Sequence, residues 1–152
     1  ACFLTYATLG EGEIVAPGQL PVKTMRDVYH AERIGPQTAM YGVLSTESVS
    51  DERLSSLNAA TREAGHDGVC LPFVASSGSG ASPAGVLRAY RRLNVSGYIV
   101  EESAQEAVDE ALDDIPAAGP AGRANVVEYE EGRLIGEWAP DLPEALYLLT
   151  TP

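Results

Sequence analysis

MYGVLSTESVSDERLSSLNAATREAGHDGVCLPFVA, residues 40–75, contains two apolar strands with an amphipathic helix between them. The helix is predicted over 51–64, because Ser50 is a favourable N-cap and Gly65 suits the position just after a helix end. Its inward face consists of Leu54, Leu57 and Ala64. The two strands are predicted over 40–44 and 68–75. This order of strand, helix and strand is typical of a parallel sheet covered by helices.

The alternation of strands and helices continues to the end of the chain. Further elements are a strand over 98–100, a hairpin over 125–129 and 133–138, and helices over 83–93, 103–115 and 143–149. Glu131-Gly132 supplies the hairpin turn. Ser103 and Glu106 have the spacing of a capping box, and the inner stripe of that helix is Ala104, Val108, Ala111 and Ile115. The predicted fold class is α/β, a three-layer sandwich with a mostly parallel, mixed sheet.

The first 38 residues follow a different pattern. Residues 1–9 predict a buried strand with no partner strand before it, and 10–21 predict a loop. A short helix is expected over 22–30, and Gly35-Pro36 ends the segment. We therefore expect residues 1–38 to be a piece of something longer, and residues 39–152 to be the α/β domain.

The composition excludes several classes of partner and site. Ten Lys+Arg against 22 Asp+Glu give a net charge of −12, which repels nucleic acid and anionic membranes, so neither partner is expected. No apolar run approaches the length of a bilayer span. Two cysteines, Cys2 and Cys70, are too few for a disulfide framework and favour a reducing, cytoplasmic location. His30 and His66 lack zinc-motif neighbours, so no metal site is expected.

Four local features could carry chemistry, but each has a simpler interpretation. The loop 77–82 lies between a strand and a helix, as phosphate-binding loops do. However, Pro83 replaces the third glycine of the motif and no lysine follows, which favours a connecting loop. The acidic run 101–114 favours a solvated helix face over a cation-binding surface, and Cys70 favours a core position over a nucleophile. A solvated face is also favoured over an anion site for Arg88, Arg91 and Arg92.

With these elements in order, residues 40–143 resemble the N-terminal, substrate-binding domain of shikimate dehydrogenase. The matching stretches are YGVL (41–44), LNAA (57–60), LPF (71–73), GRANVV (122–127) and EGRLIG (131–136). The preceding FLTYATL (3–9) and APGQ (16–19) resemble the last barrel strand and loop of type I 3-dehydroquinate dehydratase. Residues 33–42 look like the junction of the two enzymes when they are fused. The resemblance implies a shikimate-dehydrogenase-like domain over 39–152, without a dinucleotide domain, preceded by the strand, loop and helix of a dehydratase barrel and a linker over 1–38.

The resemblance also implies that the family's catalytic groups have been replaced. Gln105 stands at the position of the catalytic lysine, and Pro140 or Asp141 at that of the partner aspartate. A glutamine amide has no titratable proton, so it cannot act as a general acid or base. We therefore expect that no catalytic residue is retained in this chain.

The substrate-binding positions that the resemblance implies are only partly retained. Asn125 matches the family's asparagine, Asp51 and Arg53 stand at the positions of its paired serines, and Gln19 matches a dehydratase glutamine. Like charge from Asp51, Glu101 and Glu102 in a cleft would cost a carboxylate ligand about 1–4 kcal/mol. Arg53 could still pair with such a ligand in a bidentate way.

Three functions follow from these residues. The first is a degenerate, non-catalytic domain of the shikimate pathway of aromatic amino acid biosynthesis, attached to a 3-dehydroquinate dehydratase barrel upstream. The second is the substrate-binding fragment of an active bifunctional enzyme, with shikimate or 3-dehydroshikimate as ligand. The third is a binding module for another small anion, centred on Arg53 and Asn125. We expect no cofactor in this chain, and NADP only if the parent protein is an active dehydrogenase.

Overall fold

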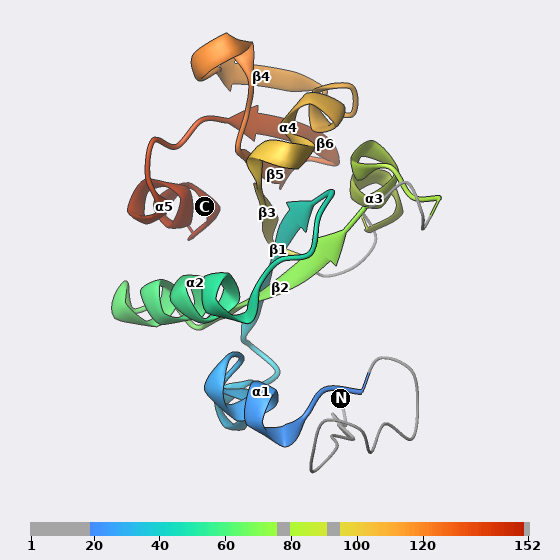
Figure 1. Ribbon diagram of the computed structural model, residues 1–152. Coiled ribbons are helices and arrows are strands. Elements are labelled where there is room, and N and C mark those ends of the chain that lie inside the picture. Colours follow the sequence, from blue (N-terminus) through green and yellow to red (C-terminus); the bar gives the residue numbers. More distant parts are fainter. Residues whose placement is uncertain (1–18, 76–79, 91–94, 151–152) are drawn as a thin grey trace.

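A computed structural model describes residues 19–75, 80–90 and 95–150 of the chain. Six strands form one mixed sheet in the order β2-β1-β3-β5-β6-β4 (Figure 1). The strands are β1 (Ala39–Ser45), β2 (Gly68–Val74), β3 (Gly97–Val100), β4 (Asp114–Ala117), β5 (Val126–Glu130) and β6 (Arg133–Glu137). The helices are α1 (Val22–Asp27), α2 (Asp51–Glu63), α3 (Pro83–Tyr90), α4 (Glu102–Asp109) and α5 (Leu142–Thr150), with short 3-10 helices η1 (Ala31–Arg33) and η3 (Pro120–Gly122).

The sheet has a parallel half and a hairpin half. β1 pairs in parallel with both β2 and β3, and β4 pairs in parallel with β6. The hairpin β5–β6 is antiparallel and joins the sheet through an antiparallel pairing of β5 with β3. The α/β fold with a mixed sheet that the sequence predicts is therefore confirmed.

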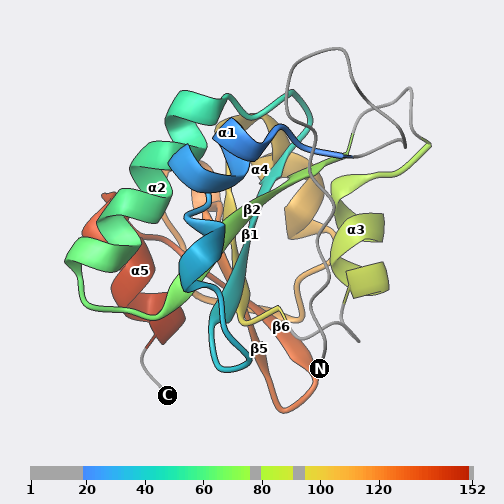
Figure 2. The ribbon, with the colours of Figure 1, turned by 90° about the horizontal axis from the view of Figure 1, so that it is seen from below.

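Helices cover both faces of the sheet, which makes three layers. One core cluster joins α2 and α5 to the sheet through Leu54, Leu57, Ala145 and Leu149. The other joins α3 and α4 through Val86, Leu87, Ala104 and Val108. Figure 2 shows α2 and α5 on one side of the strands and α3 on the other.

The residues that end α2 and turn the β5–β6 hairpin have the conformations that the sequence predicts. The Ser50 Oγ accepts a hydrogen bond from the Arg53 N–H at 3.2 Å, so Ser50 is the N-cap of α2. Gly65 follows the end of α2 with φ +81°, a backbone conformation that glycine adopts at low cost. Glu131 and Gly132 both have positive φ in the β5–β6 turn, as a tight two-residue hairpin requires. The predictions for α2 and the hairpin are confirmed, except that Ala64, expected on the inward face of the helix, is exposed and follows its last residue, Glu63.

The predicted helix over 103–115 is wrong in its second half. α4 ends at Asp109, and Asp114–Ala117 form β4 at the edge of the sheet. Pro116 has no N–H to donate, which an edge strand tolerates and a helix interior does not. The predicted capping box is also wrong, because the N-cap is Glu101 without a side-chain cap and the Ser103 Oγ accepts from the Thr46 N–H at 3.2 Å instead.

The segment before the sheet packs against it. α1 ends at Asp27 rather than at residue 30, but Val28 and Tyr29 are buried in the cluster that includes Leu54 and Leu57.

The predicted strand over 1–9 and most of the predicted loop over 10–21 lie outside the described residues, as do 76–79 and Arg91 and Arg92. Within the described residues, no helix combines the length and the apolar character needed to cross a membrane.

Cys70 is a core residue, as predicted. Its side chain is fully buried in β2, and its Sγ lies 3.7 Å from the Thr61 Oγ1. Burial raises the pKa of the Cys70 thiol, and the contact with Thr61 only partly offsets that shift. A thiol that resists ionisation is a poor nucleophile, so the position gives Cys70 a packing role.

Glu128 on β5 is the one acid with a large pKa shift among the described residues. Burial, with further contributions from Glu137 and Glu130, raises the pKa of Glu128 from 4.5 to about 7. Its Oε1 is buried and has no hydrogen-bond partner within the described part of the chain. The folded state therefore holds a proton on Glu128 at a pH where the unfolded chain has lost it.

This proton makes the stability depend on pH. Between about pH 4.5 and 7 the folded state binds more protons at this site than the unfolded state, so stability falls as the pH rises through that range. We expect Glu128→Gln to remove this loss and to be about 1–2 kcal/mol more stable than the wild type at about pH 8, with the shift discounted for solvent screening. Urea unfolding at about pH 5 and pH 8 measures it. Glu63→Gln, which removes an exposed charge from α2, is the control, and an equal pH dependence in both variants would contradict the assignment.

Candidate functional site

A pocket of about 520 Å³ opens where β1 and β3 end. Two neighbouring parallel strands bring the loops after their carboxyl ends to one edge of the sheet, which is where ligands bind in open α/β sheets. The lining residues come from the loop after β1, the first turn of α2 and the start of α4: Ser45, Glu47, Ser48, Val49, Ser50, Arg53, Glu101, Glu102 and Ser103. This pocket is the candidate site.

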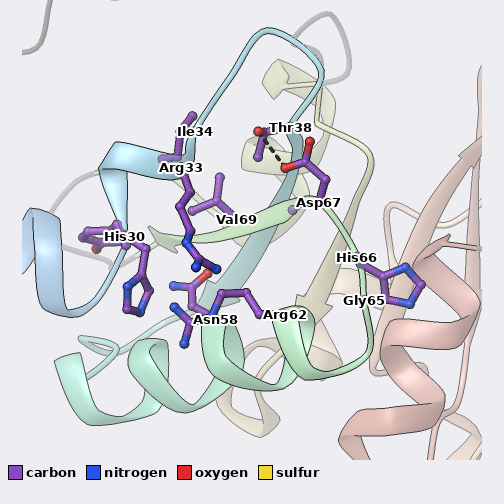
Figure 3. A pocket seen from close by; sticks show the side chains of 12 residues that line it. His30, Arg33, Ile34, Thr38, Asn58, Arg62, Gly65, His66, Asp67 and Val69 are labelled. Atoms are coloured by element: carbon purple, nitrogen blue, oxygen red, sulfur yellow. Dashed lines mark hydrogen bonds between the residues drawn. The ribbon is translucent and has the colours of Figure 1, made fainter.

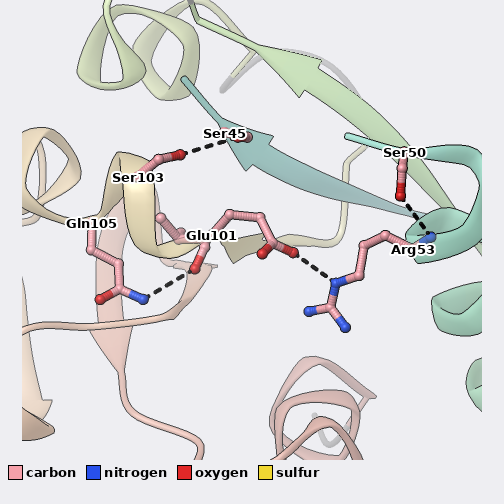
Figure 4. Close-up of polar contacts among 7 residues, drawn as sticks. Ser45, Ser50, Arg53, Glu101, Ser103 and Gln105 are labelled. Carbon is pink, nitrogen blue, oxygen red and sulfur yellow. Dashed lines mark hydrogen bonds and ion pairs between the residues drawn. The ribbon is translucent and has the colours of Figure 1, made fainter. Parts of the chain in front are cut away.

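An ion pair crosses the mouth of the candidate site. The Arg53 Nε lies 3.0 Å from the Glu101 Oε1 (Figure 4). Arg53 comes from α2 and Glu101 is the residue between β3 and α4, so the pair links two elements across the pocket. Both side chains are partly solvent-exposed, so the pair adds little stability, and its effect is to hold the guanidinium at the pocket.

Serine hydroxyls connect the loop after β1 to α4. The Ser45 and Ser103 Oγ atoms lie 3.1 Å apart (Figure 4). The Ser45 Oγ also accepts from the Glu47 N–H at 3.0 Å, and the Thr46 Oγ1 donates to the Ser103 carbonyl at 3.2 Å. These bonds join the end of β1 and the residues after it to the start of α4, and the Ser45 and Ser103 side chains are among those that line the pocket. A ligand with several hydroxyl groups of its own matches this lining.

Gln105 lies behind the candidate site rather than in it. Its side chain is 8% exposed, and its Nε2 donates to the Val100 carbonyl at 3.4 Å (Figure 4). The amide therefore stabilises the connection from β3 to α4. It does not line the pocket.

Asn125 makes two hydrogen bonds to a single backbone position. Its Nδ2 donates to the Ala139 carbonyl at 2.7 Å, and its Oδ1 accepts from the Ala139 N–H at 2.8 Å. These bonds join the start of β5 to the chain after β6. Asn125 is not among the lining residues, so the structure does not bring Arg53 and Asn125 together in this pocket.

The other predicted residues do not line the candidate site. Asp51 is exposed in the first turn of α2, next to Ser50. The Asp141 Oδ1 accepts from the Glu144 N–H at 3.0 Å, so it caps the start of α5, and Pro140 precedes it in the loop after β6. Gln19 precedes α1 and is not among the lining residues.

The charge of the candidate site is negative. Glu47, Glu101 and Glu102 face one cation, Arg53. A carboxylate ligand must compete with Glu101 for Arg53 and meets three like charges, as the sequence predicts for Glu101. Among the described residues, no group of three His, Cys, Asp or Glu side chains is arranged to hold a metal ion.

Sequence reasoning missed the hydroxyl lining of the candidate site. Ser45 and Ser103 are 58 residues apart and match no motif. Only the topology could have pointed to them, because Ser45 ends β1 and Ser103 follows the neighbouring parallel strand β3. Glu47 is an isolated acid in a polar loop, and nothing in its local sequence distinguishes it.

The comparisons with known proteins agree with this fold. No protein-family model matches the chain. The chain is 26% identical over 137 residues, 88% of its own length, to the bifunctional 3-dehydroquinate dehydratase/shikimate dehydrogenase, chloroplastic, of Arabidopsis thaliana, and covers 22% of that protein. Shikimate 5-dehydrogenase of Listeria monocytogenes, solved with shikimate and NAD, matches at 28% identity with a TM-score of 0.55, over 69% of this chain and 36% of that one. Shikimate dehydrogenase of Aquifex aeolicus matches at 26% identity with a TM-score of 0.53, over 68% and 38%.

The described residues thus form a shikimate-dehydrogenase-like α/β domain. The chain is similar to part of a bifunctional protein of the shikimate pathway, and it spans about a fifth of that relative's length and over a third of the matched dehydrogenase chains. The resemblance predicted from the sequence is confirmed.

Proposed function

We propose that this chain is a shikimate-pathway domain that keeps the shape of a dehydrogenase substrate domain but does not transfer hydride. In this proposal it accompanies a 3-dehydroquinate dehydratase, whose barrel ends in residues 1–38. The similarity to the bifunctional Arabidopsis protein supports this arrangement. The buried Cys70 thiol fits a reducing compartment such as the cytoplasm, and the Arabidopsis relative is described as chloroplastic.

The observation that carries the proposal is the environment of Gln105. The resemblance puts the family's proton-handling lysine at this position, and the glutamine amide here is buried and bonded to the Val100 carbonyl. Lys23, the only lysine in the sequence, is exposed on α1 and does not line the candidate site. No lysine amine therefore lines the pocket to exchange a proton with a substrate hydroxyl.

Hydride transfer by the natural full-length protein tests the proposal. With NADP and shikimate we expect no NADPH above the enzyme-free background, because neither Gln105 nor any neighbouring lysine can serve as the base. A competent shikimate dehydrogenase under the same conditions is the positive control. Shikimate-dependent NADPH formation would overturn the proposal. If it were lost in Gln105→Ala and kept in Glu106→Gln, the active group would be at position 105.

A second function has support of its own. The candidate site presents serine hydroxyls and the Arg53 guanidinium, and one of the similar structures is a complex with shikimate and NAD. The chain would then be the substrate-binding part of an active bifunctional enzyme that uses NADP. Calorimetry with shikimate and 3-dehydroshikimate separates the two functions, since saturable binding that Arg53→Gln weakens favours this one. An absence of binding by the full-length protein eliminates it.

A further inference from the structure

A second pocket, of about 280 Å³, lies at the opposite end of the sheet from the candidate site. It is bounded by the segment before β1, the start of β2 and the C-terminal end of α2 (Figure 3). Its charged and titratable lining residues are Tyr29, His30, Arg33, Arg62, His66 and Asp67. We call it the basic pocket, because Arg33 and Arg62 lie there with one lining acid in a chain whose net charge is −12. The His66 ring points away from them, with its Nε2 3.2 Å from the Thr150 Oγ1 on α5.

Within the part of the chain that the structure describes, the two arginines of the basic pocket have no counterion. Four other arginines, Arg26, Arg53, Arg123 and Arg133, form ion pairs. By contrast, neither guanidinium of Arg33 and Arg62 has a hydrogen bond or an ion pair within the described residues. Figure 3 shows both side chains extending from different segments toward the same space beside Asn58. Two unpaired cations that converge in one concavity repel each other unless an anion lies between them.

The one acid of the basic pocket is already engaged. The Asp67 Oδ1 accepts a hydrogen bond from the Thr38 Oγ1 at 2.8 Å (Figure 3). That contact directs the carboxylate toward the start of β1, away from the arginines. Asp67 therefore reduces the positive charge of the pocket but does not neutralise it.

The backbone holds the arginines in position from both sides. His30 has φ 49° and ψ 49°, a left-handed conformation that is uncommon for a non-glycine residue, and it begins η1, which carries Arg33. Tyr29, just before it, is buried in the core, so η1 is anchored to the domain. Arg62 lies in the last turn of α2, where the carbonyls of Ala60, Thr61 and Arg62 accept the backbone N–H groups of Ala64, His66 and Gly65. Because these carbonyls already accept backbone hydrogen bonds, they are not free to pair with the arginines.

We propose that the basic pocket binds a compact dianion of the phosphate or phosphate-monoester class between Arg33 and Arg62. Guanidinium groups match the oxygen geometry of phosphate, and two of them balance two negative charges. The bound anion would join the segment before β1 to the end of α2. The proposal does not depend on the function of the candidate site, which lies at the other end of the sheet.

The test uses the wild-type chain and inorganic phosphate at constant ionic strength. Calorimetry should show saturable binding that chloride does not reproduce. NMR amide shifts induced by phosphate should map to residues 30–34 and 58–68. An absence of saturable binding would overturn the proposal, and so would shifts that map to Arg53 or Arg123 instead.

Single substitutions test the phosphate site in a second, independent way. Arg33→Gln and Arg62→Gln should each weaken phosphate binding by about tenfold or more, because each removes a charge-assisted contact. Arg62→Lys keeps the charge without the two-pronged geometry and should lie between wild type and Arg62→Gln. Arg133→Gln, an exposed arginine on β6, is the matched control and should bind like wild type. Equal affinity of Arg33→Gln, Arg62→Gln and wild type contradicts the site.

Discussion

Gly42→Ala is expected to destabilise the chain by about 3 kcal/mol, a large effect for the addition of one methyl group. Gly42 lies in β1, between β2 and β3. A Cβ at this position would lie 2.2 Å from the Tyr98 Cδ1 and 3.0 Å from the Phe73 Cδ2. Such contacts are far inside van der Waals distance, so either the ring or the strand must move.

Tyr98 has no room to move. Its side chain is 0% exposed, and its ring packs edge-on against Phe73 at 5.6 Å and Tyr129 at 6.3 Å between centroids. Displacement of the ring would disturb the cluster that also holds α3 and α4 on the sheet. The cost therefore falls near the upper end of the range for overpacking of a core, about 1–3 kcal/mol.

Urea unfolding monitored by circular dichroism measures this loss. Gly35→Ala is the control, because a Cβ there meets nothing within 4 Å and the change in stability should stay within about 0.5 kcal/mol. Similar stabilities of the two variants would mean that β1 and β3 are not packed as the structure shows.

Much of the fold could be predicted from local sequence patterns. α2 has an N-cap, an apolar stripe and a terminal glycine within sixteen positions of one another, and the β5–β6 hairpin has its turn at Glu131-Gly132. β4 could not be predicted in this way. It is four residues long and contains Pro116, and its one neighbour among the described strands is β6, a contact that no local pattern encodes.

Some residues of the candidate site could be predicted from the family resemblance and others only from the topology. The resemblance pointed to Arg53 and Glu101, and the structure joins them in an ion pair in the pocket. The serine hydroxyls of the lining come together only through the parallel pairing of β1 and β3. The basic pocket likewise depends on tertiary structure, since Arg33 and Arg62 are far apart in the sequence and both line it where the segment that follows the buried Tyr29 lies beside the end of α2.

Asn58→Ala is expected to lower the free energy of unfolding by about 3 kcal/mol, because the Asn58 amide hydrogen-bonds the backbone of β2 at the edge of the sheet. Among the described strands, β2 lies at the edge of the sheet, so its backbone at Cys70 has a neighbouring strand of that set on one side only. The Asn58 Nδ2 donates to the Cys70 carbonyl at 3.3 Å, and the Asn58 Oδ1 accepts from the Cys70 N–H at 2.7 Å. An alanine leaves both backbone groups without a partner in the fully buried environment of Cys70, where each unsatisfied group costs about 1–3 kcal/mol.

Asn58→Asp separates the two halves of this contact. The carboxylate still accepts from the Cys70 N–H, but it cannot donate to the Cys70 carbonyl unless it is protonated. We therefore expect Asn58→Asp to be as destabilised as Asn58→Ala at about pH 8 and to recover part of the difference from wild type at about pH 4. Ser56→Ala, an exposed change on the same helix, should stay within about 0.5 kcal/mol of wild type at both pH values. If Asn58→Ala matches Ser56→Ala in urea unfolding, water satisfies the Cys70 backbone as well as the amide does, and the edge of β2 is open to solvent rather than closed by α2.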